Sequence, residues 1–152
     1  MTTSTALITA DLVDLDLPAA DRAGVVRSLA QRLVAAGRVT DLEQFLTDIE
    51  AREAQMPTGL EGGIGIPHCR SAAVTAPTVG FGRSVAGVDF GAEDGPADLV
   101  FLIAAPEGGG DEHMTVLAAL ARRLVRASFR DTLRSATEAA TAAEFIAKEV
   151  SA

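Results

Sequence analysis

Apolar residues recur three or four positions apart in most of the segments that we expect to be helical. Helices are predicted over residues 21–37, 40–56, 112–126 and 141–150, with a short segment around Leu133 before the last one. The apolar stripes of the first three are Val25, Val26, Leu29 and Leu33, then Leu42, Phe45, Leu46 and Ile49, then Met114, Leu117, Leu120, Ala121 and Leu124. Two helices begin with the Thr-x-x-Glu spacing of a capping box, at Thr40–Glu43 and Thr141–Glu144.

Short apolar or alternating runs predict the strands. We expect strands at residues 12–15, 64–66, 78–83 and 99–104, and a turn with a short edge strand over residues 85–90. The run at 99–104 is continuously apolar, as in a strand covered on both faces. Because strands and helices alternate, the pattern predicts an α/β fold whose mixed, largely parallel sheet carries helices on both faces. No internal repeat or linker interrupts the chain, so we expect one domain.

Charge and length exclude several classes of function. The 152 residues carry a net charge of −8, which disfavours binding to nucleic acids and to anionic membrane surfaces. The first eleven residues lack the pattern of a signal peptide, and the longest strongly apolar run, 99–105, is too short to span a bilayer. If the protein serves transport, the membrane channel is therefore expected on another chain or domain.

Two residue counts restrict the chemistry further. Cys69 is the only cysteine, so no intramolecular disulfide can form, in agreement with a reducing cytoplasm. Lys148, near the end of the sequence, is the only lysine. Mechanisms that depend on a lysine, such as those of P-loop nucleotide-binding proteins and Schiff-base enzymes, are therefore nearly excluded.

The two histidines, His68 and His113, are the first candidates for catalysis. His68 follows a predicted strand and the sequence Gly62-Gly63-Ile64-Gly65-Ile66-Pro67. His113 follows a buried strand and a glycine-rich loop, at a helix N-terminus whose N–H groups favour anions. Ligand sites of α/β sheets collect at such strand ends. One histidine in such a place is more often a surface or capping residue, but two in a chain that has only two favour function.

The residues around His68 resemble a known family. Arg52-Glu53, Thr58-Gly59 and Gly63-Ile64-Gly65-Ile66-Pro67-His68 are similar to the pattern of the fructose/mannitol-type IIA domains of the bacterial sugar phosphotransferase system (PTS). The segments 99–106, Glu112-His113 and the helix with Leu117, Leu120 and Leu124 match in the same order, so the resemblance runs from about residue 12 to about 150. It implies one such domain over residues 1–152, with a core of about 6–150 and a mixed, mostly parallel five-stranded sheet.

The resemblance also implies roles for individual residues. His68 corresponds to the phosphorylated histidine, His113 to a second active-site histidine that supports it, and Arg52 to the arginine that stabilises the phosphoryl charge. Thr58 corresponds to a threonine near the site. We further expect backbone N–H groups near Gly62 and Gly63 to complete a cradle for the phosphoryl group. An unprotonated imidazole and a planar guanidinium suit this chemistry, which requires no metal or cofactor.

The function implied is that of a cytoplasmic phosphoryl carrier. His68 would accept a phosphoryl group from the phosphohistidine carrier protein HPr and pass it to a cysteine of a IIB domain, with a membrane IIC component downstream and a fructose-type sugar as cargo. An alternative is a nitrogen-type regulatory IIA protein, whose phosphorylation state controls partner proteins. A third hypothesis is a binding module in which His68 is inert.

Other chemistries fit the sequence less well. A cysteine-dependent phosphatase would need an arginine six residues after Cys69, where Thr75 stands, so we expect Cys69 to be a small buried side chain. The Gly108–Gly110 run lacks the Gly-Lys-Ser/Thr of a phosphate loop, and residues 111–113 lack zinc-type spacing. The basic stretch formed by Arg122, Arg123 and Arg126 is interpreted as a solvated face in preference to a partner site.

Overall fold

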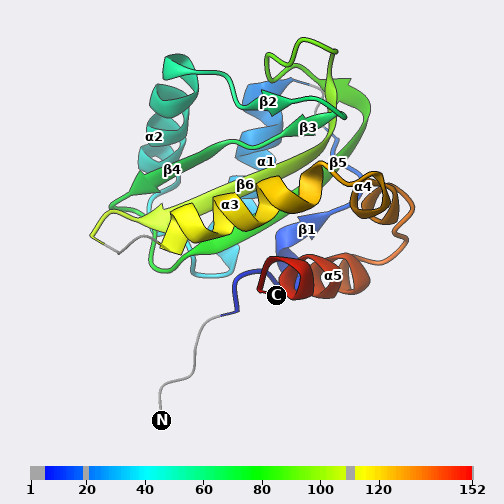
Figure 1. Cartoon of the computed structure of the whole chain (residues 1–152). Coiled ribbons are helices and arrows are strands. Elements are labelled where there is room, and N and C mark those ends of the chain that lie inside the picture. Colours follow the sequence, from blue (N-terminus) through cyan, green and yellow to red (C-terminus); the bar gives the residue numbers. More distant parts are fainter. Residues whose placement is uncertain (1–5, 19–20, 109–111, 152) are drawn as a thin grey trace.

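A mixed six-stranded sheet with five α-helices around it makes up the described part of the chain (Figure 1). The structure, a computed structural model, describes residues 6–18, 21–108 and 112–151. In chain order the elements are a 3-10 turn η1 (Ala10–Leu12), β1 (Val13–Asp14), α1 (Arg22–Ala35), α2 (Leu42–Gln55), β2 (Gly59–Leu60), β3 (Ile64–Gly65), β4 (His68–Ser71), β5 (Thr78–Val88), β6 (Ala97–Pro106), α3 (Glu112–Leu124), α4 (Ala127–Arg134) and α5 (Ala139–Ser151). No helix in these ranges is long and apolar enough to cross a membrane.

The strands lie in the order β1-β5-β6-β3-β2, and β4 continues beside β6 beyond β3. The expected mixed α/β sheet is confirmed, but five strands and a mostly parallel sheet were wrong. The long central pair β5–β6 and the pair β2–β3 are antiparallel, while β1–β5, β3–β6 and β4–β6 are parallel. Residues 89–96 join β5 to β6, a length that suffices for antiparallel neighbours, whereas parallel neighbours need a longer crossover.

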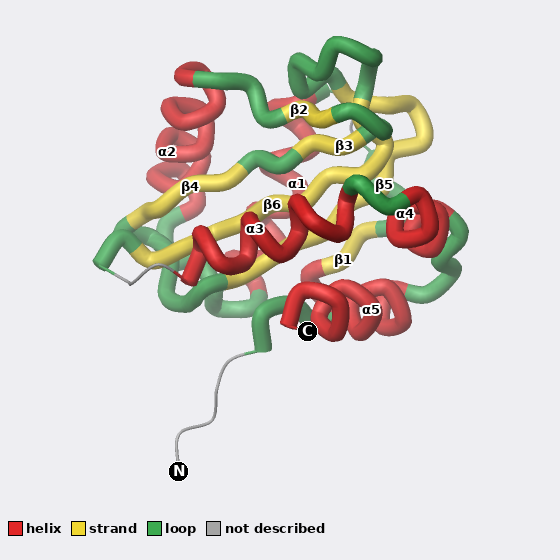
Figure 2. The backbone as a smooth tube through the Cα atoms, in the orientation of Figure 1, coloured by secondary structure: helices red, strands yellow, loops and turns green. Residues whose placement is uncertain are grey.

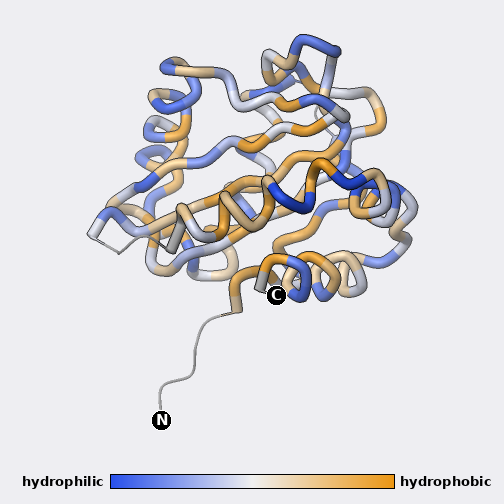
Figure 3. The backbone as a smooth tube through the Cα atoms, viewed as in Figure 1, coloured by the Kyte–Doolittle hydropathy of each residue, from blue (hydrophilic) through white to orange (hydrophobic). Residues whose placement is uncertain are grey.

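Helices cover both faces of the sheet, as expected. In Figure 2, α1 and α2 lie behind the strands and α3 lies in front of β6, while α5 lies beside β1 at the edge far from β2 and β4. Figure 3 shows the hydrophobic residues concentrated along the central strands and the hydrophilic ones on outer helix turns and loops. This two-sided cover explains why the β6 sequence is continuously apolar.

A series of phenylalanine rings links the sheet to the C-terminal helices. The ring centroids of Phe81 and Phe101 are 5.0 Å apart, those of Phe101 and Phe129 6.4 Å, and those of Phe129 and Phe145 5.2 Å. Phe81 and Phe101 come from β5 and β6, Phe129 from α4 and Phe145 from α5. Because such ring pairs add to the free energy of apolar burial, they fix α4 and α5 against the sheet.

Two arginines also hold α4. Arg83 of β5 donates from Nη1 to the carbonyl oxygens of Leu133, Arg134 and Ala136 at 2.8–3.0 Å, and from Nε to that of Leu15 at 3.1 Å. Arg83 thereby supplies a charged donor to the carbonyl groups at the C-terminal end of α4. Arg134 forms a two-pronged ion pair with Asp98 of β6, at 2.7 and 2.8 Å, and this hydrogen-bonded carboxylate raises the pKa of Arg134.

The helix boundaries differ from the expectation in their details. Asp21 caps α1 as expected, and Gly37, with a φ of 76°, follows its end. However, Asp41 caps α2 by accepting the Gln44 N–H, whereas the hydroxyl of Thr40 donates to the carbonyl of Ala73. The capping box predicted at Thr40–Glu43 was therefore wrong. So was the start at Thr141, because α5 begins at Ala139.

The strand boundaries matter most near His68. The predicted strand at 64–66 is β3, but pairing with β6 resumes at His68 as β4, after a break at Ile66 and Pro67. Residues 59–60, where no strand was predicted, form β2. The two segments expected at 78–83 and 85–90 form one strand, β5, with a register shift between Arg83 and Val88. His68 thus lies at a break along the edge of β6.

Candidate active site

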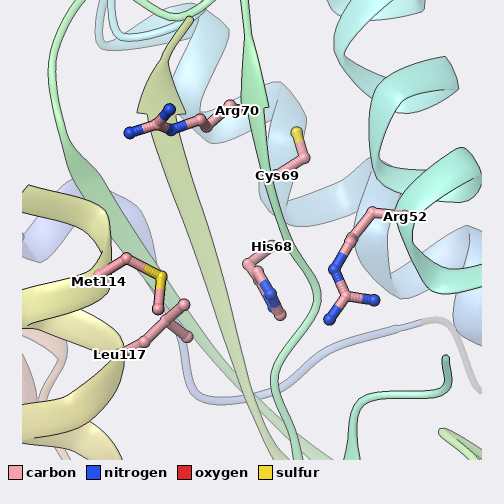
Figure 4. A pocket seen from close by; sticks show the side chains of 6 residues that line it. All are labelled: Arg52, His68, Cys69, Arg70, Met114 and Leu117. Atoms are coloured by element: carbon pink, nitrogen blue, oxygen red, sulfur yellow. The ribbon is translucent and has the colours of Figure 1, made fainter. Parts of the chain in front are cut away.

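A pocket of about 520 Å³ opens beside His68 (Figure 4). The described residues that line it come from α2, β4 and α3: Arg52, His68, Cys69, Arg70, Met114 and Leu117. In Figure 4, Arg52 lies on one side of His68, and Met114 and Leu117 lie on the other. The pocket therefore combines a histidine with two cationic groups and an apolar wall.

The backbone before β4 determines the hydrogen bonding of His68. Its ring atom Nδ1 lies 2.8 Å from the carbonyl oxygen of Ile66. A carbonyl oxygen can only accept a hydrogen bond, so this contact assigns the proton of the neutral ring to Nδ1. The lone pair is then on Nε2. In this tautomer the half-buried His68 has a nucleophilic nitrogen opposite its bonded one.

Arg52 stands in the last turn of α2, with its guanidinium extending toward the ring of His68 (Figure 4). Its Nη1 donates to the carbonyl oxygen of Met56, the residue that ends the helix, at 3.3 Å. This bond directs a half-buried, permanently charged group into the pocket. The planar guanidinium can bind two oxygens of a phosphoryl group at once.

Besides Cys69, three residues that line the pocket were not assigned to the site from the sequence. Arg70 shares a face of β4 with His68, because side chains alternate along a strand, and it is exposed. Met114 and Leu117 lie on the flank of α3, and Met114 is 55% exposed. The alternation of β4 was the available signal for Arg70, but no strand had been predicted to begin at His68.

Cys69 points to the opposite face of β4 from His68 and is buried, as expected. Burial, and secondarily the carboxylate of Asp48, raise the pKa of its thiol to about 12. Asp48 itself accepts a 2.6 Å hydrogen bond from the hydroxyl of Ser71. Since the thiolate is the nucleophilic form of cysteine, the Cys69 thiol is unreactive near neutral pH.

Thr58 lies behind the pocket and does not line it. Its side chain and N–H are held by Glu53: Thr58 Oγ1 donates to Oε1 at 2.7 Å, and Thr58 N–H donates to Oε2 at 2.8 Å. Both residues are buried. The next residue, Gly59, is also fixed, because a Cβ there would lie 2.6 Å from the Ala92 nitrogen. The Arg52-Glu53 and Thr58-Gly59 pairs of the sequence thus belong to one tightly packed region at the end of α2.

The structure does not bring Gly62 and Gly63 to the pocket, contrary to the expected cradle. The N–H of Gly62 donates to Asp94 at 2.9 Å, and its carbonyl oxygen accepts from Arg134. Both glycines have positive φ, 95° and 78°, and a Cβ on Gly63 would lie 2.5 Å from Oδ1 of Asp98. The turn needs glycine for its conformation and for the close approach of these side chains.

His113 belongs to α3, directly before Met114, but its side chain lies outside the described residues. The same holds for the side chain of Glu112 and for residues 109–111, which include part of the Gly108–Gly110 run. Over the ranges that are described, no three His, Cys, Asp or Glu residues are grouped so that they could hold a metal ion.

Comparison with known proteins identifies the family. The model of the family "Phosphoenolpyruvate-dependent sugar phosphotransferase system, EIIA 2" matches residues 6–149. The chain belongs to this family. It is therefore a phosphotransferase component of the PTS, with the α/β fold of a IIA domain.

The relatives of this PTS IIA domain include sugar-specific PTS components and nitrogen regulatory proteins. The fructose-specific EIIA component of Haloferax volcanii is 40% identical over 141 residues, 92% of each chain. The nitrogen regulatory protein of Pseudomonas aeruginosa is 35% identical over 126 residues, 82% of each chain. The fructose-specific EIIABC component of Bacillus subtilis is 38% identical, but the match spans 21% of its length.

Similar solved structures likewise include a nitrogen regulatory protein and a sugar-specific PTS component. Nitrogen regulatory protein IIA-Ntr from Neisseria meningitidis superimposes with a TM-score of 0.83 at 28% identity, over 92% of this chain and 96% of that one. The complex of enzyme IIAMTL and phosphorylated enzyme IIBMTL from Escherichia coli matches with a TM-score of 0.75 at 26% identity, over 95% and 99% of the chains.

Proposed function

We propose that this PTS IIA domain carries a phosphoryl group on Nε2 of His68. One observation carries the proposal: the hydrogen bond from Nδ1 to the Ile66 carbonyl leaves the lone pair on Nε2 of a histidine that lines a pocket with Arg52. An imidazole nitrogen near neutral pH is a competent nucleophile, and the N–P bond it forms remains available for transfer.

The proposed transfer consists of two in-line displacements. The lone pair of His68 Nε2 attacks the phosphorus of the phosphohistidine of HPr; a new N–P bond forms, and the donor N–P bond breaks with its electron pair returning to the donor imidazole. The thiolate of a IIB cysteine then attacks the same phosphorus, and the electron pair of the His68 N–P bond returns to Nε2. Throughout, the proton stays on Nδ1 and remains hydrogen-bonded to the Ile66 carbonyl oxygen.

The other residues receive supporting roles. Arg52 neutralises the charge that is spread over the phosphoryl oxygens in the transition state. His113 is proposed as the second histidine of the site, because it precedes Met114 of the pocket wall in α3. Thr58 is proposed to act indirectly, through the backbone next to His68. Gly62 and Gly63 have no part in the proposed site.

The proposed pathway takes phosphoryl groups from HPr to a IIB domain and a membrane IIC component, with fructose as the sugar and the exchange taking place in the cytoplasm. The relatives named fructose-specific EIIA and EIIABC support the sugar. The complex between a mannitol IIA and a phosphorylated IIB supports the acceptor.

A regulatory role is the second proposed function. The Pseudomonas aeruginosa relative and the Neisseria meningitidis structure are both nitrogen regulatory proteins, and each matches most of this chain. In this case the same phosphorylated His68 would control the binding of partner proteins. Rapid transfer of the group to a IIB cysteine favours the carrier role, and its absence favours the regulatory one.

The test is the intact-protein mass after incubation with phosphoenolpyruvate, enzyme I and HPr. We expect one acid-labile phosphoryl group on the wild type and none on His68→Ala, whose fold is checked by far-UV circular dichroism. Phosphorylation that persists in His68→Ala, or a wild type left unmodified by phosphorylated HPr, would contradict the assignment. Adding a phosphoryl-free IIB domain to the modified protein then separates the two roles.

A further inference from the structure

A buried carboxylate, that of Glu53, lies behind the pocket and does not line it. Glu53 follows Arg52 in α2 but faces the interior, with 4% of its surface exposed. Each of its two oxygens accepts a hydrogen bond from Thr58. Burying a charged group is unfavourable unless it is well hydrogen-bonded, and an apolar residue would fill such a place at lower cost. Stability alone therefore does not account for a glutamate here.

The hydrogen bonds continue from Glu53 to the ring of His68. The carbonyl oxygen of Thr58 accepts the N–H of Ile66 at 3.2 Å. The carbonyl oxygen of Ile66 accepts Nδ1–H of His68 at 2.8 Å. Glu53 thus binds Thr58, Thr58 binds the N–H of Ile66, and the carbonyl of Ile66 accepts the hydrogen bond from His68.

The segment between β3 and β4 is anchored from two sides. Pro67 has no N–H, so it cannot pair with a neighbouring strand through a donor. Its carbonyl oxygen accepts the N–H of Ile103 from β6 at 3.0 Å, while the Ile66 N–H is bound to Thr58. Sheet pairing therefore fixes the β6 side of this break, and the contact of Glu53 with Thr58 fixes the α2 side.

We infer that Glu53 is a positioning residue for the phosphoryl acceptor, His68. By accepting two hydrogen bonds from Thr58, Glu53 orients the Ile66 carbonyl. This carbonyl keeps the proton of His68 on Nδ1 and the lone pair on Nε2. The inference rests on the proposed function of His68. Without a fixed acceptor at Nδ1, both tautomers of the neutral ring are populated, and the one protonated at Nε2 cannot attack phosphorus there. The loss should therefore be in the rate of transfer and not in the binding of the donor.

The primary test is the tautomer of His68 in the unphosphorylated protein, measured by long-range ¹H–¹⁵N NMR correlation of the imidazole. We expect a single Nδ1–H form in the wild type and a mixture in Glu53→Ala and Thr58→Val. Thr58→Ser keeps the hydroxyl donor and should restore the single form. Glu50→Ala, an exposed glutamate of the same helix, is the matched control and should leave the tautomer as in the wild type.

The kinetic readout is single-turnover transfer from phosphorylated HPr. We expect the maximal rate to fall by about 10- to 100-fold in Glu53→Ala, as for residues that orient a reacting group from behind, with an unchanged half-saturating HPr concentration. A folded Thr58→Val protein that keeps the Nδ1–H tautomer and the wild-type rate would overturn the inference, even if Glu53→Ala failed to fold. Because the NMR measurement requires no phosphorylation, a wild type that is never phosphorylated would count against the proposed function alone.

Discussion

The ring nitrogen Nδ1 of His68 lies 2.8 Å from the carbonyl oxygen of Ile66, only two residues earlier in the chain. Ile66 lies in the break between Gly65, where pairing of β3 with β6 ends, and His68, where pairing of β4 with β6 begins. A residue in this break therefore supplies the hydrogen-bond acceptor that holds the proton on Nδ1 and leaves the lone pair on Nε2.

This geometry predicts the atom that is modified. The phosphoryl group should be on Nε2, because Nδ1 carries the proton that the Ile66 carbonyl accepts. Heteronuclear ³¹P and ¹⁵N NMR of the phosphorylated protein distinguishes the two isomers. Finding Nδ1-phosphohistidine instead would mean that the imidazole ring of His68 reorients before it reacts, contrary to the assigned tautomer.

Replacing Arg52 should slow transfer without moving the modified residue. Loss of one preorganised cationic donor to the transition state lowers rates by about 10²-fold or more, so Arg52→Ala should show a fall of this order in single-turnover transfer. Arg52→Lys should recover only part, since an ammonium cannot bind two oxygens in a fork. Arg27→Ala provides the control, because Arg27 pairs with Glu43 on an exposed surface. Equal rates for Arg52→Ala and Arg27→Ala would remove Arg52 from the proposed mechanism.

Arg83 should be important for stability, although it lies away from the pocket. Arg83→Ala removes the donor to three carbonyls at the end of α4 and to that of Leu15. We expect the free energy of unfolding to fall by about 2–3 kcal/mol, the range for bonds to a charged donor whose partners are left partly buried. Urea unfolding measures this free energy. It is followed by far-UV circular dichroism, because the chain has no Trp or Tyr whose fluorescence could report on unfolding. A change within about 0.5 kcal/mol, as expected of a surface substitution, would contradict the tethering role.

The buried thiol of Cys69 predicts a loss of stability at alkaline pH. Its pKa is raised from 9.0 to about 12 in the folded protein, so the folded state holds the proton more tightly than the unfolded one. The contribution of the protonated thiol is complete below pH 9 and is lost as the pH rises toward 12, by at most about 1.4 kcal/mol per pH unit.

The comparison of wild type with Cys69→Ala isolates this effect. Tyr is absent and Lys148 is the only lysine, so few other side chains titrate in this range. We expect the free energy of unfolding of the wild type to fall with pH above 9 more steeply than that of Cys69→Ala. Parallel pH profiles for the two proteins, or rapid alkylation of the native thiol at neutral pH, would show that Cys69 is not buried in this way.

The sequence allowed two residues of the candidate site to be grouped. Arg52 and His68 are sixteen positions apart, yet the resemblance grouped them, and the structure brings both to one pocket. Gly62 and Gly63 were misinterpreted, because glycine has the same appearance in a sequence whether its N–H is offered to a ligand or taken by a neighbour. Here Asp94 takes the N–H of Gly62, and Asp94 is far away in the chain. Contacts of this kind leave no local pattern.

The fold shows the same division between local and distant information. Asp21 and Gly37 mark the two ends of α1 as expected, because helix capping depends on residues that are neighbours in the sequence. The direction of β5 relative to β6 was not recoverable, because a strand covered on both faces has the same apolar sequence in parallel and antiparallel sheets. Thr40 and Asp41 are both good capping residues, and the carbonyl of Ala73, which binds the Thr40 hydroxyl, decided between them.

The placement of α5 has a practical consequence for labelling. Lys148, the only lysine of these 152 residues, is exposed on this helix, which packs beside β1. His68 lies in β4, at the other side of the sheet from β1 (Figure 1). A fluorophore attached through lysine chemistry would therefore report on docking with partner proteins while the face around the histidine stays unmodified, without any engineered residue.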